Sequence, residues 1–290
     1  MTELEFVIRT VGERTEDVCV ELVNLQKDEH ESLHLLRENT HAKAVESTIA
    51  IGLESRAEWL VAIDADMLLT PGSILSIRKE IRSCSDAIVV LHPAVVDKLY
   101  RMRRWGLTVY RKAALEELNI KFQDIKKKQN IKIESAAIKA LGENKQRQVY
   151  FSREVAAIHD FYQYYKDLYR KAYLNVSRNQ GFNKDVKKCW KRLANSDPDY
   201  LVMYKAMEDA TVESRNLTNS ISDFKSSELD SIVSGLGLKE KPPLLWDDYV
   251  DQCHSVSMEE EIQLIDKDRV FNDFFDNISL TQKLKTFFRG

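Results

Sequence analysis

The chain has 290 residues, of which 43% are hydrophobic and 31% are charged, and its formal net charge is −3. This length fits one large domain or a domain with a substantial appendage, and the composition is ordinary for a protein with a hydrophobic core. A net charge this small provides no global attraction to nucleic acid, so we expect no nucleic-acid partner. No apolar run in the sequence approaches the length of a membrane span.

The cysteines and the N-terminus indicate an intracellular protein. The four cysteines lie far apart, at positions 19, 84, 189 and 253, and form no metal-binding spacing, which is typical of reduced thiols. The residues after Met1 are Thr-Glu-Leu-Glu, without the basic start and apolar run of a secretory signal. We therefore predict a cytoplasmic location.

The first half of the chain alternates predicted strands and helices. A strand over Leu4–Thr10 leads through a polar loop to Thr15, which fits the N-cap of a helix ending near Leu25. Such a loop often binds a nucleotide or phosphate, although any βα unit has the same order. Further strands are expected at 32–37, 59–63, 87–91, 107–110 and 148–158, and helices at 41–53, 73–82 and 133–141. This alternation predicts an α/β fold, with a mostly parallel, doubly wound sheet flanked by helices.

Two aspartates follow the most apolar of these strands. Trp59–Ile63 runs directly into Asp64 and Asp66, and a Thr-Pro-Gly turn signal follows at 70–72. Side chains two residues apart on extended chain point the same way, so we expect both carboxylates to project together from the end of the strand. Oxygen ligands of this kind suit Mg²⁺ or Mn²⁺. The alternative interpretation is that both aspartates belong to a turn or cap a helix.

A histidine follows a later strand in the same way. Residues 155–158 form an apolar run that ends at His159, which could be a metal ligand or a structural histidine. A helix is expected from Phe161 onward, and its aromatic stripe is typical of core packing. Beyond Gly181 only helical segments with polar linkers are predicted. We expect an α/β domain over residues 1–180 and a helical extension over residues 181–290.

Taken in order, these segments resemble the GT-A-type nucleotide-sugar glycosyltransferases, particularly the inverting family-two group. Phe6–Arg14 is similar to the first strand and nucleotide-binding loop, and Ile63–Asp66 to the Asp-X-Asp motif. Trp105–Lys112 resembles the strand after the acceptor-side loop. Glu134 and the strand ending at His159 resemble the base-bearing helix and the metal-binding histidine of the family. The resemblance covers residues 4 to 174, just over half of the chain.

The resemblance implies a metal-dependent transfer of a sugar from a UDP- or GDP-sugar to a hydroxyl group on a glycan or lipid-linked acceptor. The implied cofactor is Mn²⁺ or Mg²⁺, held by Asp64, Asp66 and His159. Glu134 would be the general base that removes the acceptor's proton. The nucleotide sugar would be bound by a set of residues from the first half of the chain: Arg9, Thr10, Glu13, Arg14, Lys43 and Asp64.

The sequence departs from the family pattern at several points. Glu134 is followed by Ser135 where the family has an acidic pair, and no aspartate-rich turn follows the second strand. Two alternatives stay open. One is a retaining GT-A glycosyltransferase, in which Glu134 would not act as a base. The other is a non-catalytic nucleotide-binding or scaffold protein with a helical interaction tail.

A basic, aromatic stretch follows His159. Residues 161–195 contain nine Lys or Arg and two Asp, an excess of seven positive charges. This stretch could hold an anionic acceptor, or it could give peripheral contact with an anionic membrane, helped by the amphipathic segment 280–288. The alternative is a solvated helix face.

Overall fold

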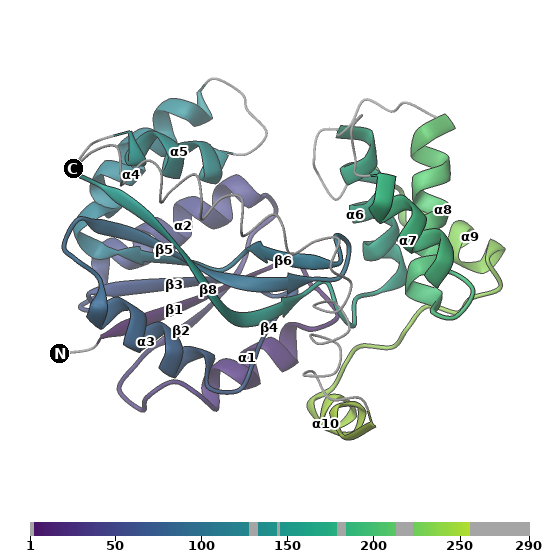
Figure 1. Cartoon of the computed structure of the whole chain (residues 1–290), viewed down its shortest axis with the longest axis horizontal. Coiled ribbons are helices and arrows are strands. Elements are labelled where there is room, and N and C mark those ends of the chain that lie inside the picture. Colours follow the sequence, from purple (N-terminus) through teal and green to yellow (C-terminus); the bar gives the residue numbers. More distant parts are fainter. Residues whose placement is uncertain (1–2, 128–132, 144–145, 179–183, 213–222, 256–290) are drawn as a thin grey trace.

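The computed structural model describes residues 3–127, 133–143, 146–178, 184–212 and 223–255. Its centre is an eight-stranded sheet with the order β2-β1-β3-β7-β5-β8-β4, in which β6 pairs with β5. Helices cover both faces of this sheet, and a further group of helices lies beside one end of it (Figure 1). The predicted α/β class, a sheet flanked by helices, is confirmed.

The α/β part begins with β1 (Leu4–Thr10), α1 (Glu16–Asn24), β2 (Leu33–Arg37), α2 (His41–Glu54), β3 (Trp59–Asp64), β4 (Met67–Leu69) and α3 (Ser73–Ser83). It continues with β5 (Ile88–Asp97), β6 (Met102–Trp105), β7 (Thr108–Arg111), a 3₁₀ turn (Lys112–Ala114), α4 (Leu115–Lys126), α5 (Ile133–Gly142) and β8 (Gln148–His159). The remaining helices are α6 (Tyr165–Arg178), α7 (Lys184–Leu193), α8 (Pro198–Val212), α9 (Ser226–Gly235) and α10 (Trp246–Ser255).

The direction of the strands determines where functional side chains can meet. Strand β1 is parallel to β2 and β3, β5 is parallel to β8, and β7 is antiparallel to both β3 and β5. It follows that β1, β2, β3, β5 and β8 all run the same way, while β4, β6 and β7 run against them. The carboxyl ends of β1, β3, β5 and β8 therefore meet at one edge, the usual ligand-binding edge of an open α/β sheet.

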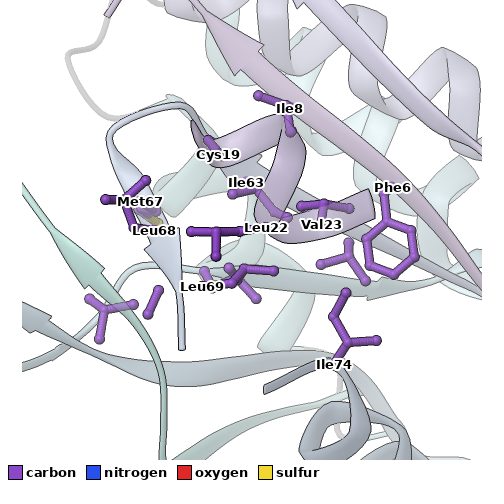
Figure 2. Packing of buried hydrophobic residues seen from close by; sticks show 14 of the residues in the cluster. Phe6, Ile8, Cys19, Leu22, Val23, Ile63, Met67, Leu68, Leu69 and Ile74 are labelled. Carbon is purple, nitrogen blue, oxygen red and sulfur yellow. The ribbon is translucent and has the colours of Figure 1, made fainter. Parts of the chain in front are cut away.

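Each face of the sheet packs against its own helices. On one face, Leu22 and Val23 of α1 and Ile74 of α3 pack against Phe6 and other buried strand residues (Figure 2). The opposite face is covered by α2, α4 and α5. Strands β1 and β3 are buried almost throughout, which explains the apolar run Trp59–Ile63 of β3 and the shorter run Phe6–Ile8 of β1.

A separate hydrophobic cluster joins the helices beside the sheet. Tyr169 of α6, Trp190 of α7, Met203 of α8 and Phe224 are buried in it together. The indole Nε1 of Trp190 donates to the carbonyl of Leu99 at 2.8 Å, which ties α7 to the hairpin between β5 and β6. Helix α6 lies before the expected boundary at residue 180, yet it packs with α7, α8 and α9. Segment 280–288 lies outside the described residues.

Several elements differ from the expected ones. Strand β5 extends to Asp97, well beyond the expected end at residue 91, and β4, β6 and α4 were not expected at all. Strands β4 and β6 have three and four residues, too few for a periodic pattern to identify. Among the described helices, none combines the length and apolarity that crossing a membrane requires.

Candidate metal centre

Four charged residues meet where β5, β8 and the turn after β3 come together. Asp97 ends β5 and is paired in register with His159, which ends β8. Asp160 follows His159, and its backbone N–H donates to the carbonyl of Asp66 at 3.1 Å. Asp66 itself belongs to the tight turn between β3 and β4. The pairing of the strands thus positions Asp66, Asp97, His159 and Asp160 without help from any long loop.

The imidazole of His159 lies among three carboxylates. Its Nδ1 is 3.0 Å from Asp97 Oδ2 and 3.6 Å from Asp160 Oδ2, and its Nε2 is 3.5 Å from Asp66 Oδ1. Burial favours the neutral ring, but Asp160 and Asp66 outweigh it and raise the pKa of His159 well above its ordinary value. The shorter contact with Asp97 orients the ring and leaves Nε2 directed toward Asp66.

Lys171 completes the group from helix α6. Its ammonium forms ion pairs with Oδ2 of Asp66 and Oδ1 of Asp160. Burial alone would raise the pKa of Asp66, but the charges of Lys171 and His159 hold it well below its ordinary value. Asp66 is therefore a carboxylate at neutral pH. Its Oδ1 is buried and has no hydrogen-bond partner among the described residues.

The donor atoms of this group fit a divalent cation. Asp66, His159 and Asp160 each offer one ligand atom, and these atoms all lie within 4.8 Å of one another. A cation there would bind the buried Oδ1 of Asp66, which lies 3.5 Å from His159 Nε2 but accepts no hydrogen bond from the described residues. Two carboxylates and one imidazole are ligands that Mn²⁺ accepts, whereas Mg²⁺ prefers oxygen alone. We call Asp66, His159 and Asp160 the metal group.

Backbone strain is concentrated next to the metal group. Asp160 has φ 64° and Tyr162 has φ 59°, a left-handed conformation that is rare for residues other than glycine. Aspartate tolerates it better than most residues because its short side chain can bond locally. Strained residues of this kind persist where the surrounding structure fixes them, often at functional sites.

Buried hydrogen bonds hold the turn that carries Asp66. The hydroxyl of Thr15 donates to the carbonyl of Ala65 at 2.7 Å, and Gln163 Nε2 donates to the Thr15 hydroxyl at 2.9 Å. Thr15 precedes α1 as expected, but its side chain forms no capping bond to the helix. The Thr15 hydroxyl instead fixes the position of Asp66 through the neighbouring residue.

The loop after β1 lies close to the metal group. The Thr10 hydroxyl is 2.7 Å from Glu13 Oε2 and 2.6 Å from Glu16 Oε2, and the N–H of Val11 donates to Glu13. Burial and the charge of Asp66 raise the pKa of Glu13. Glu13 thus lies within electrostatic reach of Asp66, and Thr10 is hydrogen-bonded to Glu13.

Asp64 and Glu134 belong to a second network. Arg9 is buried and donates from Nε to Asp64 at 2.7 Å and from Nη1 to Glu134 at 2.8 Å. Glu134 also accepts a hydrogen bond from the Tyr110 hydroxyl, and His41 Nε2 lies 3.4 Å from its other oxygen. Burial opposes ionisation of Glu134, but Arg9 and His41 outweigh it and hold its pKa well below the ordinary value.

The prediction that Asp64 and Asp66 project together is wrong. Ala65 and Asp66 form a turn, so the alternation of an extended strand ends at Asp64. Asp64 pairs with Arg9, whereas Asp66 pairs with Lys171 and joins the metal group. Asp160 occupies the place in this group that the sequence had assigned to Asp64.

Two further predicted residues lie elsewhere. Arg14 donates to the carbonyls of Pro242 at 2.6 Å and Tyr162 at 2.7 Å, so it ties the chain after α9 to the loop after β8. Lys43 is exposed in the first turn of α2, and the side chain of Thr40 accepts a hydrogen bond from its backbone N–H. Neither residue contacts the metal group in the part of the chain that the structure describes.

Sequence reasoning missed Asp97, Asp160 and Lys171. Asp160 carried a signal, because it directly follows the predicted ligand His159. Asp97 was missed because β5 was expected to end six residues earlier, at Leu91. Lys171 was counted within the basic stretch, and no local pattern singles it out among its neighbours.

No protein-family model and no curated protein sequence matches this chain. Among solved structures, it is similar to a glycosyltransferase involved in the glycosylation of the major capsid of PBCV-1, with a TM-score of 0.39 and 10% identity over 55% of this chain and 93% of that one. It is also similar to 4-diphosphocytidyl-2C-methyl-D-erythritol synthase from Anaerococcus prevotii (TM-score 0.38, 8% identity, 55% and 90% covered). A third is A197 from STIV (TM-score 0.38, 16% identity, 55% and 85% covered). Similarities this weak carry no argument about function, so the proposals below rest on the residues of this chain.

Proposed function

We propose that this protein is a metal-dependent glycosyltransferase that moves a sugar from a nucleoside-diphosphate sugar to a hydroxyl acceptor on a glycan or a lipid-linked molecule. One observation carries the proposal. The buried Oδ1 of Asp66 lacks a hydrogen-bond partner among the described residues, and it belongs to a three-ligand group at the carboxyl edge of the sheet. That edge is where an α/β protein binds its ligand.

The metal group suits the departure of a nucleoside diphosphate. Asp66, His159 and Asp160 would hold Mn²⁺ or Mg²⁺, and Asp97 would orient His159. A bound divalent cation would act as a Lewis acid that neutralises the charge developing on the leaving diphosphate. Glu13 of the loop after β1 lies within electrostatic reach of Asp66, and Thr10 bonds to Glu13, so this loop is our proposed site for the UDP or GDP part of the donor.

Residues farther from the metal group have proposed roles through the resemblance. Arg9 would act in nucleotide binding by orienting Asp64, the carboxylate proposed to contact the ribose. Arg14 would support the loop after β1 rather than contact the donor, because its donors bond to two carbonyls. Lys43 is exposed on α2, so its long side chain would have to extend away from the helix to contact the donor.

Glu134 is our proposed general base if the reaction inverts configuration. Attack from the face opposite the leaving group requires a carboxylate within reach of the acceptor hydroxyl. The contacts with Arg9, Tyr110 and His41 stabilise its charged form, which weakens it as a base. This observation favours a second candidate, a retaining glycosyltransferase in which Glu134 positions Arg9 instead.

The test is to incubate the protein with a panel of UDP- and GDP-sugars and to measure release of the nucleoside diphosphate with and without Mn²⁺. We expect Mn²⁺-dependent release for at least one donor, lost in Asp66→Ala and His159→Ala. Asp124→Ala is the matched control, because Asp124 is exposed and its ion-pair partner among the described residues is Lys127, at 3.8 Å. No release from any donor, or equal release by the Asp66 variant, would overturn the proposal. The anomeric configuration of the product, read by NMR, separates the inverting from the retaining reaction.

A further inference from the structure

Lys171 shares two carboxylates with the candidate metal ion. Its ammonium pairs with Oδ2 of Asp66 and Oδ1 of Asp160, and its side chain is only 20% exposed. The other oxygens of the two carboxylates lie beside His159, 3.5 Å away for Asp66 Oδ1 and 3.6 Å away for Asp160 Oδ2. The ammonium and a metal ion can therefore bind the same two carboxylates through different oxygens.

If a divalent cation binds there, it and the Lys171 ammonium are two positive charges on the same carboxylates, and they repel each other. A like charge within ~4–6 Å disfavours the charged form of its neighbour, and a partly buried pair is screened only weakly by salt. Lys171 must therefore lower the affinity of the metal group for a divalent cation. Once such a cation neutralises Asp66 and Asp160, the ammonium is left with an unbalanced charge. An anionic ligand that binds next to the cation can balance it.

We propose that Lys171 binds the phosphates of the nucleoside diphosphate, and that it keeps the affinity for the divalent cation low until this anion arrives. The inference rests on the proposed function, because it takes the metal group as the site of the diphosphate. Lysine suits the role, since its compact ammonium binds phosphate as a point charge. Because coupling between two ligands is reciprocal, the nucleotide must also raise the affinity for the cation.

The inference makes two predictions of opposite sign for one substitution. In Lys171→Met, the Kd for Mn²⁺ without nucleotide falls by at least about tenfold, because a nearby positive charge is removed. In the same variant, the Kd for UDP or GDP at saturating Mn²⁺ rises by at least about tenfold, because the phosphates lose a charged ligand. A side chain with only a structural role would weaken both.

Calorimetric titration measures both constants. Lys166→Met is the matched control, because Lys166 lies on the same helix and pairs with the exposed Asp230 instead of the metal group. Lys171→Arg keeps the charge and is expected to retain the low Mn²⁺ affinity of the wild type. Circular dichroism with and without Mn²⁺ shows whether Lys171→Met is folded. If Lys171→Met is less stable than the wild type, the gain in melting temperature that Mn²⁺ gives it must still exceed the gain of the wild type.

The outcomes separate this inference from the proposed function. The proposed function is overturned if the wild type fails to bind Mn²⁺ or fails to bind the nucleotide. If the wild type binds both, the metal and nucleotide site that the proposed function requires is present, and the inference is overturned by any of three results. These are unchanged or weaker Mn²⁺ binding by Lys171→Met, unchanged nucleotide affinity in that variant, and a tenfold gain in Mn²⁺ affinity for Lys171→Arg.

Discussion

Asp97 is expected to set the metal affinity without contacting the metal. It is 3% exposed, its Oδ2 lies 3.0 Å from Nδ1 of His159, and its Oδ1 accepts the backbone N–H of Tyr100 at 2.8 Å. In Asp97→Asn the amide oxygen can keep the bond to Tyr100, which turns the NH₂ group toward Nδ1. That arrangement favours the His159 tautomer with its proton on Nε2, so the lone pair needed for metal binding is lost.

The loss is expected to be ~10–100-fold in Mn²⁺ affinity, or about 1.4–2.7 kcal/mol, as for other groups that orient a metal-binding histidine. Loss of the pair with Arg104 adds little to the stability cost, because Arg104 is partly exposed and lies 3.7 Å away. Calorimetric Mn²⁺ titration measures the effect, with thermal melting to check the fold and Asp86→Asn, an exposed carboxylate, as control. If Asp97→Asn binds Mn²⁺ like the wild type while His159→Ala does not, Asp97 does not orient the ligand.

Three further predictions concern other parts of the chain. Glu134→Gln is expected to lower kcat by ~10²–10⁴ with little change in donor affinity if Glu134 is the base; near-normal turnover would favour the retaining reaction. Asp199→Asn breaks buried pairs with Lys98 and Lys241 and is expected to cost ~3–5 kcal/mol in unfolding free energy, measured by urea titration. These lysines hold the pKa of Asp199 below its ordinary value of 3.8 against the effect of burial, so its contribution is present above that pH and is lost as the pH falls through the folded-state pKa. The variant should therefore lose less stability in acid than the wild type, and equal acid sensitivity would contradict this assignment. Flotation with anionic liposomes at low and high salt tests α7, where Lys188 and Lys191 are exposed; a wild type that never floats rules out membrane contact.

Most strand and helix positions in the first half of the chain were predictable because each of these elements has a strong local cause. Strand β1 was expected over the residues that form it, and α2 differs from its expected range only at the last residue. A buried parallel strand reads as a continuous apolar run, and an amphipathic helix as a periodic one. Strand β4 has no such signature, because its three residues owe their strand conformation to pairing with β8.

The site was only partly predictable, because its residues meet through pairing between distant strands. Asp66 and His159 were each identified from their positions after apolar strands, and the structure places both in the metal group. Asp97 joins them through its register with His159, a contact across 62 positions of sequence. Nothing local to Asp97 or Lys171 encodes that contact.

The error over Asp64 has a simple physical origin. The rule that alternate side chains share a face holds only while the chain stays extended, and here the turn begins at the next residue. Asp64 and Asp66 consequently face different partners, Arg9 and Lys171. A short motif therefore identified the right edge of the sheet, but it did not identify which carboxylates lie together with His159.

The most direct test of the metal group is anomalous diffraction from crystals of the protein grown with Mn²⁺. We predict one anomalous peak, from a Mn²⁺ ion bound by Asp66, His159 and Asp160. Its ligand distances should be roughly 2.0–2.3 Å, from the range typical of Mg²⁺ up to the lower end of the range for Ca²⁺. A peak at Asp64 and Glu134 instead, or no peak near His159 at saturating Mn²⁺, would contradict the assignment of these three residues as the metal group.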